Sequence, residues 1–591
     1  MHHHTFNSSS GHDGLDNDSF AHGTLHHHDG HDGHDSHGHA PASRGSEDED
    51  DQTRGTSGTT SFTGDIYIDG ILWGGSYVDA EPITYSFWDD PELDNDFWDI
   101  ASPDNRAVTS AGGRPYVWNK QTKDSMELAL KQWSNVANIE FEKNTDDDAD
   151  ADFGFLLVGN REFGGEEILG LFGPPDTYGA GIGYFNYDAA SWDDDGLPQG
   201  SMGFATLIHE LGHGLGLAHP HDNGGDSPKY PGVVDSSDTG RNALNQGVYT
   251  TMSYNDGLNG NVSLSYGNQG TPMAFDIAAI QHLYGANMTY NSGDTTYRVP
   301  GQNQVGTYYS SIWDGGGTDT ISAQGVSANT TINLNEAPLV GANAGGYLSK
   351  AEGIDGGFTI ANNVTIENAI GGTGDDVIVG NDADNTLDGN GGADVLLGQD
   401  GDDMLLGMAG ADVLNGGFGD DRLKGGKDRD ELYGEKDSDR LYGGQDRDKL
   451  YGGQQSDRLY GEQDRDKLYG GQDDDVLDGG QGRDQLFGGQ GGDRLSGGAD
   501  NDYLEGGGGD DVLFGNGGAD LFVVAPGKGT DVIKDFAPSQ DSLGLGSGLS
   551  VSDVTIVPLQ NRVAIEAGGD RLALLIGVDA SQLTDDVFQL I

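Results

Sequence analysis

The sequence contains no cysteine among its 591 residues, so neither a disulfide framework nor thiol chemistry is available to it. No apolar run approaches the roughly 20 residues of a membrane-spanning helix, since even LALLIGV near the C-terminus is far shorter. The N-terminus is polar and rich in histidine, unlike a secretory signal peptide. We therefore expect no stable membrane association, and a stabilising cross-link other than disulfides if the protein works outside the cell.

Basic residues are also scarce. The chain has 30 Lys and Arg against 98 Asp and Glu, a formal net charge of −68. This excess disfavours nucleic acid and anionic membranes as partners. It favours a cation that neutralises the carboxylates, and calcium suits such hard oxygen ligands. The length exceeds what one hydrophobic core supports, so two or three domains are expected.

The segment HELGHGLGLAHP, which begins at His209, carries the strongest chemical signal. His209 and His213 are four residues apart and share one face of a helix, while Glu210 projects beside them. His219 joins them only if the helix ends in between, and Gly216 can end it because glycine accepts a positive φ. A helix with solvated histidines is the alternative, but the full pattern rarely arises by chance. Three nitrogen ligands with an open coordination position predict a catalytic rather than a structural zinc site.

A second segment, YTTMSYND, places Met252 and Tyr254 downstream of the histidines. Together the two segments resemble the metzincin proteases, and the tyrosine resembles their serralysin branch. ITYSFW, LALKQWSNVANIEFE and PMAFDIAAIQHLYGAN are similar to that branch as well. The resemblance implies an α+β metzincin catalytic domain, with Met252 beneath the metal. It also implies that Tyr254 is a releasable fourth zinc ligand that donates a hydrogen bond to the oxyanion during catalysis.

The composition changes along the chain and predicts five parts. Residues 1–60 form a His/Asp-rich tail that is expected to be disordered, residues 61–290 the catalytic domain, and residues 291–370 a linking β segment. Residues 371–524 form a repeat region and residues 525–591 a C-terminal cap with an export signal. For the tail, a metal-collecting role or a propeptide remains as open as a simply solvated segment.

Hydrophobic patterning predicts the main elements of the catalytic part. Residues 64–73 and 151–159 are interpreted as strands, and residues 123–137 as a helix. Residues 180–188 alternate as a strand shortly before the zinc segment. By resemblance to the family, this last strand would be the sheet edge along which a substrate peptide lies antiparallel.

Seventeen consecutive nonapeptides run from Gly371 to Val523, each beginning with Gly. The sixth position is Asp except at Asn385, and the eighth is apolar. This period is typical of the calcium-binding parallel β-roll of repeats-in-toxin proteins, so an all-β roll is expected after the catalytic domain. The glycines allow tight turns, the Asp supplies an anionic oxygen and the apolar residue fills the core. The predicted calcium ligands at the sixth position are Asp376, Asp394, Asp403, Asp412, Asp421, Asp484, Asp493, Asp511 and Asp520.

The repeat also contains evidence for a coil of 18 residues. Its fifth position alternates between arginine and serine in the central repeats, and tyrosines at the ninth position should form two outward ladders. In those repeats the fourth position is often Asp instead of Gly, as in Asp428 and Asp446. Asp tolerates a positive φ, so the turn can survive. We hypothesise that the central coils bind calcium more weakly than the outer ones.

Segments around the roll match the same family. Asp314 and Asp319, in SIWDGGGTDTISAQG, are predicted calcium ligands at the entry to the roll. The C-terminal part resembles the cap and export signal of proteins secreted by a type I transporter. This implies an extracellular monomer whose repeats stay unfolded in a calcium-poor cytosol and fold around several calcium ions outside.

The resulting interpretation is a secreted endopeptidase that hydrolyses protein and peptide substrates. One zinc ion would activate a water molecule, and Glu210 would act as general base. Two other interpretations remain open: an adhesive calcium-binding surface protein with a vestigial protease domain, and a calcium- or ice-binding module. The complete set of zinc ligands together with Glu210 favours the enzyme.

Overall fold

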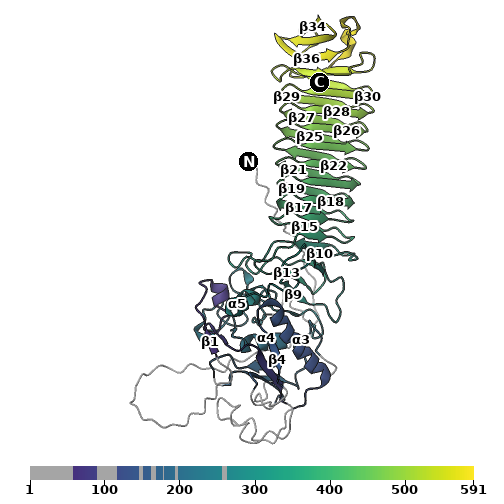
Figure 1. The fold of residues 1–591 in the computed structure, drawn as a ribbon. Helices are drawn as coiled ribbons and strands as arrows, with labels where there is room; N and C mark the ends of the chain where they lie inside the picture. Colours follow the sequence, from purple (N-terminus) through teal and green to yellow (C-terminus); the bar gives the residue numbers. More distant parts are fainter. Residues whose placement is uncertain are drawn as a thin grey trace, which may run out of the picture.

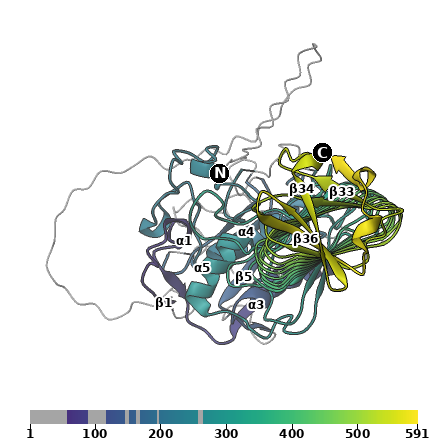
Figure 2. The same cartoon turned by 90° about the horizontal axis from the view of Figure 1, so that it is seen from above.

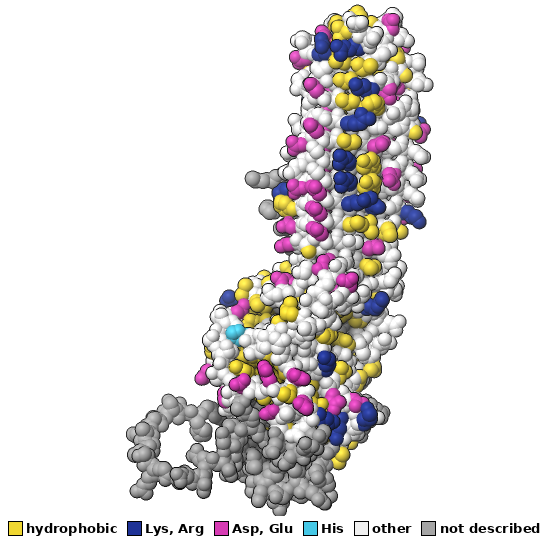
Figure 3. Space-filling model, viewed as in Figure 1, with side chains coloured by type: hydrophobic (Ala, Val, Ile, Leu, Met, Phe, Trp, Pro, Cys, Tyr) yellow, Lys and Arg dark blue, Asp and Glu magenta, His cyan; other side chains and the backbone are white. Residues whose placement is uncertain are grey.

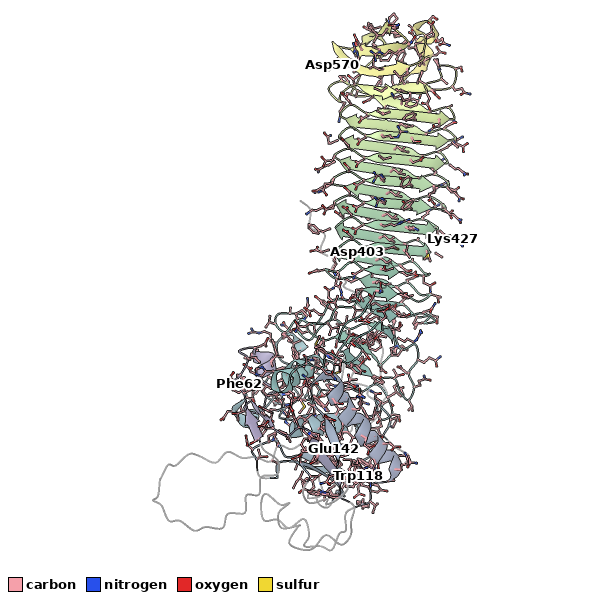
Figure 4. All side chains as sticks on the ribbon, in the orientation of Figure 1. Phe62, Trp118, Glu142, Asp403, Lys427 and Asp570 are labelled. Atoms are coloured by element: carbon pink, nitrogen blue, oxygen red, sulfur yellow. The ribbon has the colours of Figure 1, made fainter. Side chains whose placement is uncertain are left out.

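The computed structural model describes residues 57–88, 116–144, 151–160, 168–177, 179–192, 197–255 and 263–591. The predicted N-terminal tail therefore lies almost entirely outside the described residues. Figure 1 shows a part with helices and a small sheet, from which a long stack of strands rises. Figure 4 marks Trp118 and Glu142 in the first part, and Asp403 and Lys427 in the stack.

The first part is built on a five-stranded sheet with the order β4-β3-β5-β7-β6. Strands β4, β3, β5 and β7 are parallel, whereas β6 is antiparallel to β7. The sheet packs against α4, and α3 in turn contacts α4. In Figure 2, the view from above, α3, α4 and α5 appear to the left of the roll. The strands are β3 (Ile83–Phe87), β4 (Phe141–Lys143), β5 (Phe153–Val158), β6 (Gly170–Phe172) and β7 (Ile182–Asn186), and the helices are α3 (Lys120–Val136), α4 (Met202–Gly214) and α5 (Ala274–Tyr284).

The core between sheet and helices is dense in aromatic side chains. Trp133 of α3 is fully buried and donates its indole N–H to the Ile208 carbonyl of α4. Phe153 and Phe155 of β5 pack against Phe172 of β6 at ring-centroid distances of 5.0 and 6.2 Å. This packing fixes the zinc segment between α3 and the sheet.

Two of the predictions for this part are wrong. Residues 64–73, interpreted as a strand, contain the short helix α1 (Ile66–Asp69), because the side chain of Asp65 accepts the Tyr67 N–H and caps it. Residues 180–188 do form a strand, β7, but it is not at the edge of the sheet. The edge strand next to β7 is β6, and β4 is the edge strand on the other side.

The long stack is a roll of two facing sheets with 15 and 13 strands. Each nonapeptide contributes one strand, and strands 18 residues apart pair in parallel, as Leu396 does with Leu414 and Leu405 with Leu423. Two repeats therefore make one coil, as the alternating fifth position predicts. The eighth-position Leu side chains are fully buried between the sheets, and each contributes about 1.5–3 kcal/mol to folding.

The first sheet begins before the repeats and ends in the cap. Its strands, in spatial order, are β8 (Thr296–Arg298), β10 (Thr320–Ser322), β14 (Asn368–Ile370), β16 (Thr386–Asp388), β18 (Met404–Ala409), β20 (Arg422–Lys427), β22 (Arg440–Gly444), β24 (Arg458–Glu462), β26 (Val476–Gln481), β28 (Arg494–Ala499), β30 (Val512–Gly517), β32 (Asp531–Ile533), β36 (Asp570–Ile576), β35 (Arg562–Ala567) and β34 (Val554–Leu559).

The second sheet faces the first across the leucine core. Its strands are β12 (Lys350–Ala351), β11 (Thr330–Asn333), β15 (Val377–Val379), β17 (Val395–Asp400), β19 (Val413–Phe418), β21 (Glu431–Lys436), β23 (Lys449–Gly453), β25 (Lys467–Gln472), β27 (Gln485–Gln490), β29 (Tyr503–Gly508), β31 (Leu521–Val524), β33 (Ser542–Leu545) and β37 (Phe588–Leu590). Two small pairs complete the strands: β1 (Ser57–Thr59) with β2 (Ser76–Val78), and β9 (Tyr309–Ile312) with β13 (Gly357–Ile360).

The turns of the central coils keep their shape despite losing glycine. Asp428, Asp446 and Asp464 occupy the fourth position with φ between 70° and 76°, as expected for a residue that tolerates this region. The predicted aromatic ladders are also confirmed. Tyr433, Tyr451 and Tyr469 stack with ring centroids 4.9 Å apart.

No helix among the described residues combines the length and apolar character needed to cross a membrane.

Candidate metal centre and active site

Helix α4 carries the zinc segment and ends where the sequence predicts. Ser201 caps its start by accepting the Phe204 N–H. At its end Gly216 has φ +106°, the Gly216 N–H donates to the His213 carbonyl, and the Leu217 N–H donates to the Gly212 carbonyl. These two bonds form a Schellman motif, which turns the chain back toward the helix.

The turn brings the third histidine next to the other two. Nε2 of His219 lies 3.2 Å from Nε2 of His209 and 3.0 Å from Nε2 of His213. A tetrahedral zinc ion with nitrogen ligands at about 2.0–2.1 Å would place those nitrogens about 3.3 Å apart. The three predicted ligands are therefore already spaced for one zinc ion.

The other nitrogen of each ring has a hydrogen-bond acceptor. Nδ1 of His209 lies 2.7 Å from the Thr251 carbonyl oxygen, and Nδ1 of His213 lies 2.8 Å from that of Leu217. Nδ1 of His219 lies 2.8 Å from a carboxylate oxygen of Asp222. Because each Nδ1 carries the hydrogen, three bare Nε2 lone pairs face one another. Such an arrangement is stable only around a cation, so the donor set fits zinc.

The electrostatics of the rings agree with this assignment. Burial lowers the pKa of His213 to about 3, and burial also lowers the pKa of His219 to about 4. Both rings are thus neutral at pH 7, which is the state that binds a metal.

Glu210 lies against the outer strand of the sheet. Burial raises its pKa to about 8, and a hydrogen bond from the Phe172 backbone opposes that rise. A Cβ on Gly170 would lie only 2.7 Å from Cγ of Glu210, so glycine at this point of β6 leaves room for the glutamate. The carboxyl group is therefore held between the zinc helix and the strand edge.

Met252 and Tyr254 lie close to the zinc helix and its histidines. Met252 is fully buried, and its sulfur lies 2.8 Å from the position that a Cβ on Gly212 would take. The ring of Tyr254 lies 4.6 Å from that of His219 and 5.6 Å from that of His209. His221 is buried and stacks on His219, with ring centroids 4.8 Å apart.

Two supporting residues were missed by the sequence reasoning. Asp222 orients His219, and its spacing of three residues from that ligand was the signal available. Asp276 is the third residue of α5 and fully buried. Its carboxylate accepts the Thr251 N–H and the Thr250 hydroxyl, each at 2.6 Å. Only the fold brings Asp276 to the methionine turn, so no local pattern could have identified it.

The sixth-position aspartates of the roll form two continuous ladders. One oxygen of each accepts the backbone N–H of the matching residue one coil earlier, as Asp412 does from Asp394 and Asp466 from Asp448, both at 2.8 Å. The other oxygen, Oδ2, is buried without a hydrogen-bond partner in Asp394, Asp403, Asp412, Asp421, Asp430, Asp439, Asp448, Asp457, Asp466, Asp475, Asp484, Asp493, Asp502 and Asp511. Unpaired buried carboxylate oxygens are the ligands that calcium prefers.

The remaining predicted calcium ligands lie at the ends of these ladders. Asp376 accepts the Thr330 and Gly372 N–H groups at the lower end, and Asp520 accepts the Asp502 N–H at the upper end. Asp319 is buried near Asp314, which accepts the Tyr297 hydroxyl, and burial raises the pKa of Asp319 to about 6. Glu367, which the sequence reasoning missed, accepts the Asp319 N–H at 2.7 Å.

Known protein families match both the part of the chain that carries the histidines and the roll. The matrixin family matches residues 110–227, and the family described as Peptidase M10 serralysin C terminal matches residues 276–568. The chain therefore belongs to the serralysin-type metzincins.

Several named relatives of this serralysin-type chain match about half of its length. It is 37% identical to metallopeptidase AprA of Pseudomonas marginalis over 289 residues, which cover 45% of this chain and 55% of the relative. It is 34% identical to serralysin of Proteus mirabilis over 340 residues (53% and 62%) and 38% identical to serralysin C of Dickeya chrysanthemi over 278 residues (44% and 54%). The chain thus spans between 54% and 62% of the length of these relatives.

Proposed function

We propose that this serralysin-type chain is a secreted, zinc-dependent endopeptidase with a calcium-stabilised roll. The observation that carries the proposal is the convergence of three Nε2 atoms, each fixed by a hydrogen bond at its Nδ1, beside the buried Glu210. The relatives named serralysin or metallopeptidase support the same activity.

His209, His213 and His219 would hold the zinc ion, with Tyr254 as the releasable fourth ligand. When bound, zinc polarises the scissile carbonyl and makes water more acidic. Glu210 accepts the proton of the attacking water and passes it to the leaving amine. A nearby dication favours the ionised form of Glu210, which offsets the effect of its burial.

Tyr254 and Met252 have separate roles in this proposal. Tyr254 is 37% exposed, so its ring can move aside. Its hydroxyl would then donate a hydrogen bond to the oxyanion that forms on the scissile carbonyl. Met252 contacts the helix from below and does not touch the substrate. Its side chain packs against Gly212 and so fixes the position of helix α4, which carries His209 and His213.

The substrate would lie along the edge strand β6, and not along β7 as the sequence suggested. Leu171 of β6 is 53% exposed, and Phe172 borders Glu210. An extended peptide that pairs with this edge would bring its main chain past the general base. Because main-chain pairing does not depend on side chains, we expect broad sequence specificity.

Calcium would fill the Asp ladders of the roll, with Asp314 and Asp319 holding ions at its entry. The central coils have the same unpaired oxygens as the outer coils, but an additional Asp and Arg in their turns. Calcium titration of the full chain tests our hypothesis of weaker central sites. The variant Asp448→Asn should lose a weak site, whereas Asp403→Asn should lose a strong one, and equal losses would contradict it.

Export through a type I transporter before calcium-driven folding fits this scheme, because dozens of unneutralised carboxylates repel one another. The experiment for the enzyme is casein hydrolysis in constant excess calcium. A zinc-selective chelator should abolish cleavage and added zinc should restore it. Undiminished cleavage by metal-stripped protein would contradict the proposal.

A further inference from the structure

Three arginines form a column on the outer face of the first sheet. Arg422, Arg440 and Arg458 occupy the seventh position of repeats one coil apart, and they are paired in register along β20, β22 and β24. All three are exposed. The rings of Tyr442 and Tyr460 beside them are 5.0 Å apart, which gives the spacing of the column.

This column is unusual in so acidic a protein. Among the described residues none of the three arginines forms an ion pair, although the chain has more than three acidic residues for each basic one. Arg422 instead lies over the ring of Tyr442 at 5.3 Å. Like charges stacked directly opposite one another destabilise a sheet. The column therefore lowers stability unless something anionic covers it.

The opposite face of the same coils gives a direct contrast. There Lys449 also occupies a seventh position and is paired in register with Lys467 on one side, but on the other side it is paired with Glu431 and forms an ion pair with it. The seventh-position neighbours of the arginine column are uncharged, namely Met404 before it and Val476 after it. Lys424 adds a further positive charge next to Tyr442. Figure 3 shows basic side chains running beside hydrophobic ones along the roll.

We propose that this column, formed by Arg422, Lys424, Arg440, Tyr442, Arg458 and Tyr460, binds a linear carboxylated polysaccharide that lies parallel to the axis of the roll. The planar guanidinium group pairs with a carboxylate through two hydrogen bonds. Tyrosine hydroxyls would add hydrogen bonds to the sugar hydroxyls.

The spacing selects this class of polyanion. Covalent bonds of about 1.5 Å make a pyranose ring with its linking oxygen about 5 Å long, which matches the 5.0 Å step of the column. Phosphates of one strand of duplex DNA repeat at about 3.4 Å along its axis. Side chains on one face of an extended peptide repeat at about 6.6 Å. Neither fits three successive arginines.

One carboxylate, that of Asp478, is paired in register with Tyr460 at the upper end of the column, and the other carboxylates of the protein do not prevent binding. At physiological ionic strength charges separated by more than about 8 Å are largely screened, so the column determines the local field. Binding at this face needs no catalytic residue. The inference is therefore independent of the proposed function.

The test measures binding of the calcium-loaded full chain to an oligogalacturonide, which is linear and has one carboxylate per sugar. The parent should bind it, but not neutral dextran. The triple variant Arg422→Gln, Arg440→Gln, Arg458→Gln should bind at least about 10-fold more weakly and with a shallower salt dependence, because fewer counterions are released. Circular dichroism with calcium verifies that the variant is folded.

A control variant, Lys528→Gln, Lys534→Gln, Arg562→Gln, removes the same charge from exposed positions of the cap that form no column. It should bind as the parent does. The proposal is overturned if the parent does not bind the oligogalacturonide. Equal losses of affinity in the two triple variants would also overturn it. So would parental affinity of the column variant, which would indicate binding through calcium. Single-stranded oligonucleotides that bind the parent as tightly as the oligogalacturonide would overturn it as well.

Discussion

The carbonyl oxygen of Thr251 accepts a hydrogen bond from Nδ1 of His209 at 2.7 Å. The N–H of the same residue donates to Asp276 at 2.6 Å. A carboxylate at the start of α5 thus orients His209, a proposed zinc ligand on α4, through the peptide unit of Thr251. The helix α5 is in this way connected by hydrogen bonds to the proposed metal centre.

This connection predicts the effect of Asp276→Asn. The amide cannot accept both the Thr250 hydroxyl and the Thr251 N–H as strongly, so the carbonyl under His209 shifts. Zinc affinity should fall about 10- to 100-fold, the usual cost of losing a supporting hydrogen bond at a metal site. Competition with a chromophoric chelator measures it. The exposed Asp124→Asn on α3 is the control and should leave affinity unchanged.

Asp222→Asn tests the partner of His219. The change removes the charge that faces Nδ1 at 2.8 Å, which makes the ring a weaker base and a less firmly oriented ligand. We again expect a loss of zinc affinity of about 10- to 100-fold. Asp226→Asn, at an exposed position with φ 66° that asparagine tolerates, provides a matched control. Equal affinity of the two variants would contradict the assigned role of Asp222.

Gly212→Ala should destabilise the catalytic part by about 1–3 kcal/mol, the usual cost of overpacking. The new Cβ would lie 2.8 Å from the sulfur of Met252. Met252→Leu alone should cost less than the loss of a histidine ligand. In the double variant Gly212→Ala, Met252→Ala the clash disappears, so the two effects should not add. Thermal unfolding followed by tryptophan fluorescence measures this, because all seven tryptophans lie at or before residue 313.

The stability of the roll should depend on pH without calcium but not with it. Burial raises the pKa of Asp403, Asp439 and Asp475 to about 8 in the folded roll, from 3.8. The folded state then binds more protons than the unfolded state, so without calcium its stability falls as pH rises from about 4 to 8. Bound calcium replaces those protons and should remove the trend.

The measurement is unfolding of the full chain at pH 5 and pH 8, in chelator and in calcium, followed by circular dichroism. In chelator the repeats should be more stable at pH 5. Asp439→Asn should weaken both the pH dependence and the stabilisation by calcium. A roll in chelator that is more stable at pH 8 than at pH 5 would contradict the raised pKa values.

The sequence predicted what depends on fixed spacing. The four-residue interval of His209 and His213 and the glycine at position 216 determine the histidine geometry, because helix periodicity and a positive φ leave few alternatives. The nine-residue repeat likewise determines the roll, its leucine core and its 18-residue coil.

What depends on contacts between distant segments was missed. Strand β6 has three residues and no alternation, so nothing local indicates that it, and not β7, forms the edge beside Glu210. Asp276 is separated from Thr251 by 25 residues and meets it only in the fold. The helix α1 was interpreted as a strand because its apolar residues outweighed the weak capping signal of Asp65.

The most direct test of the account is the casein hydrolysis rate of Glu210→Gln against the parent, both fully loaded with zinc and calcium. The variant keeps the histidine ligands and the shape of the side chain, but it cannot accept the proton. The account predicts equal zinc content and a loss of about 10²- to 10⁴-fold in rate. Cleavage at the parental rate by a zinc-loaded Glu210→Gln would contradict it.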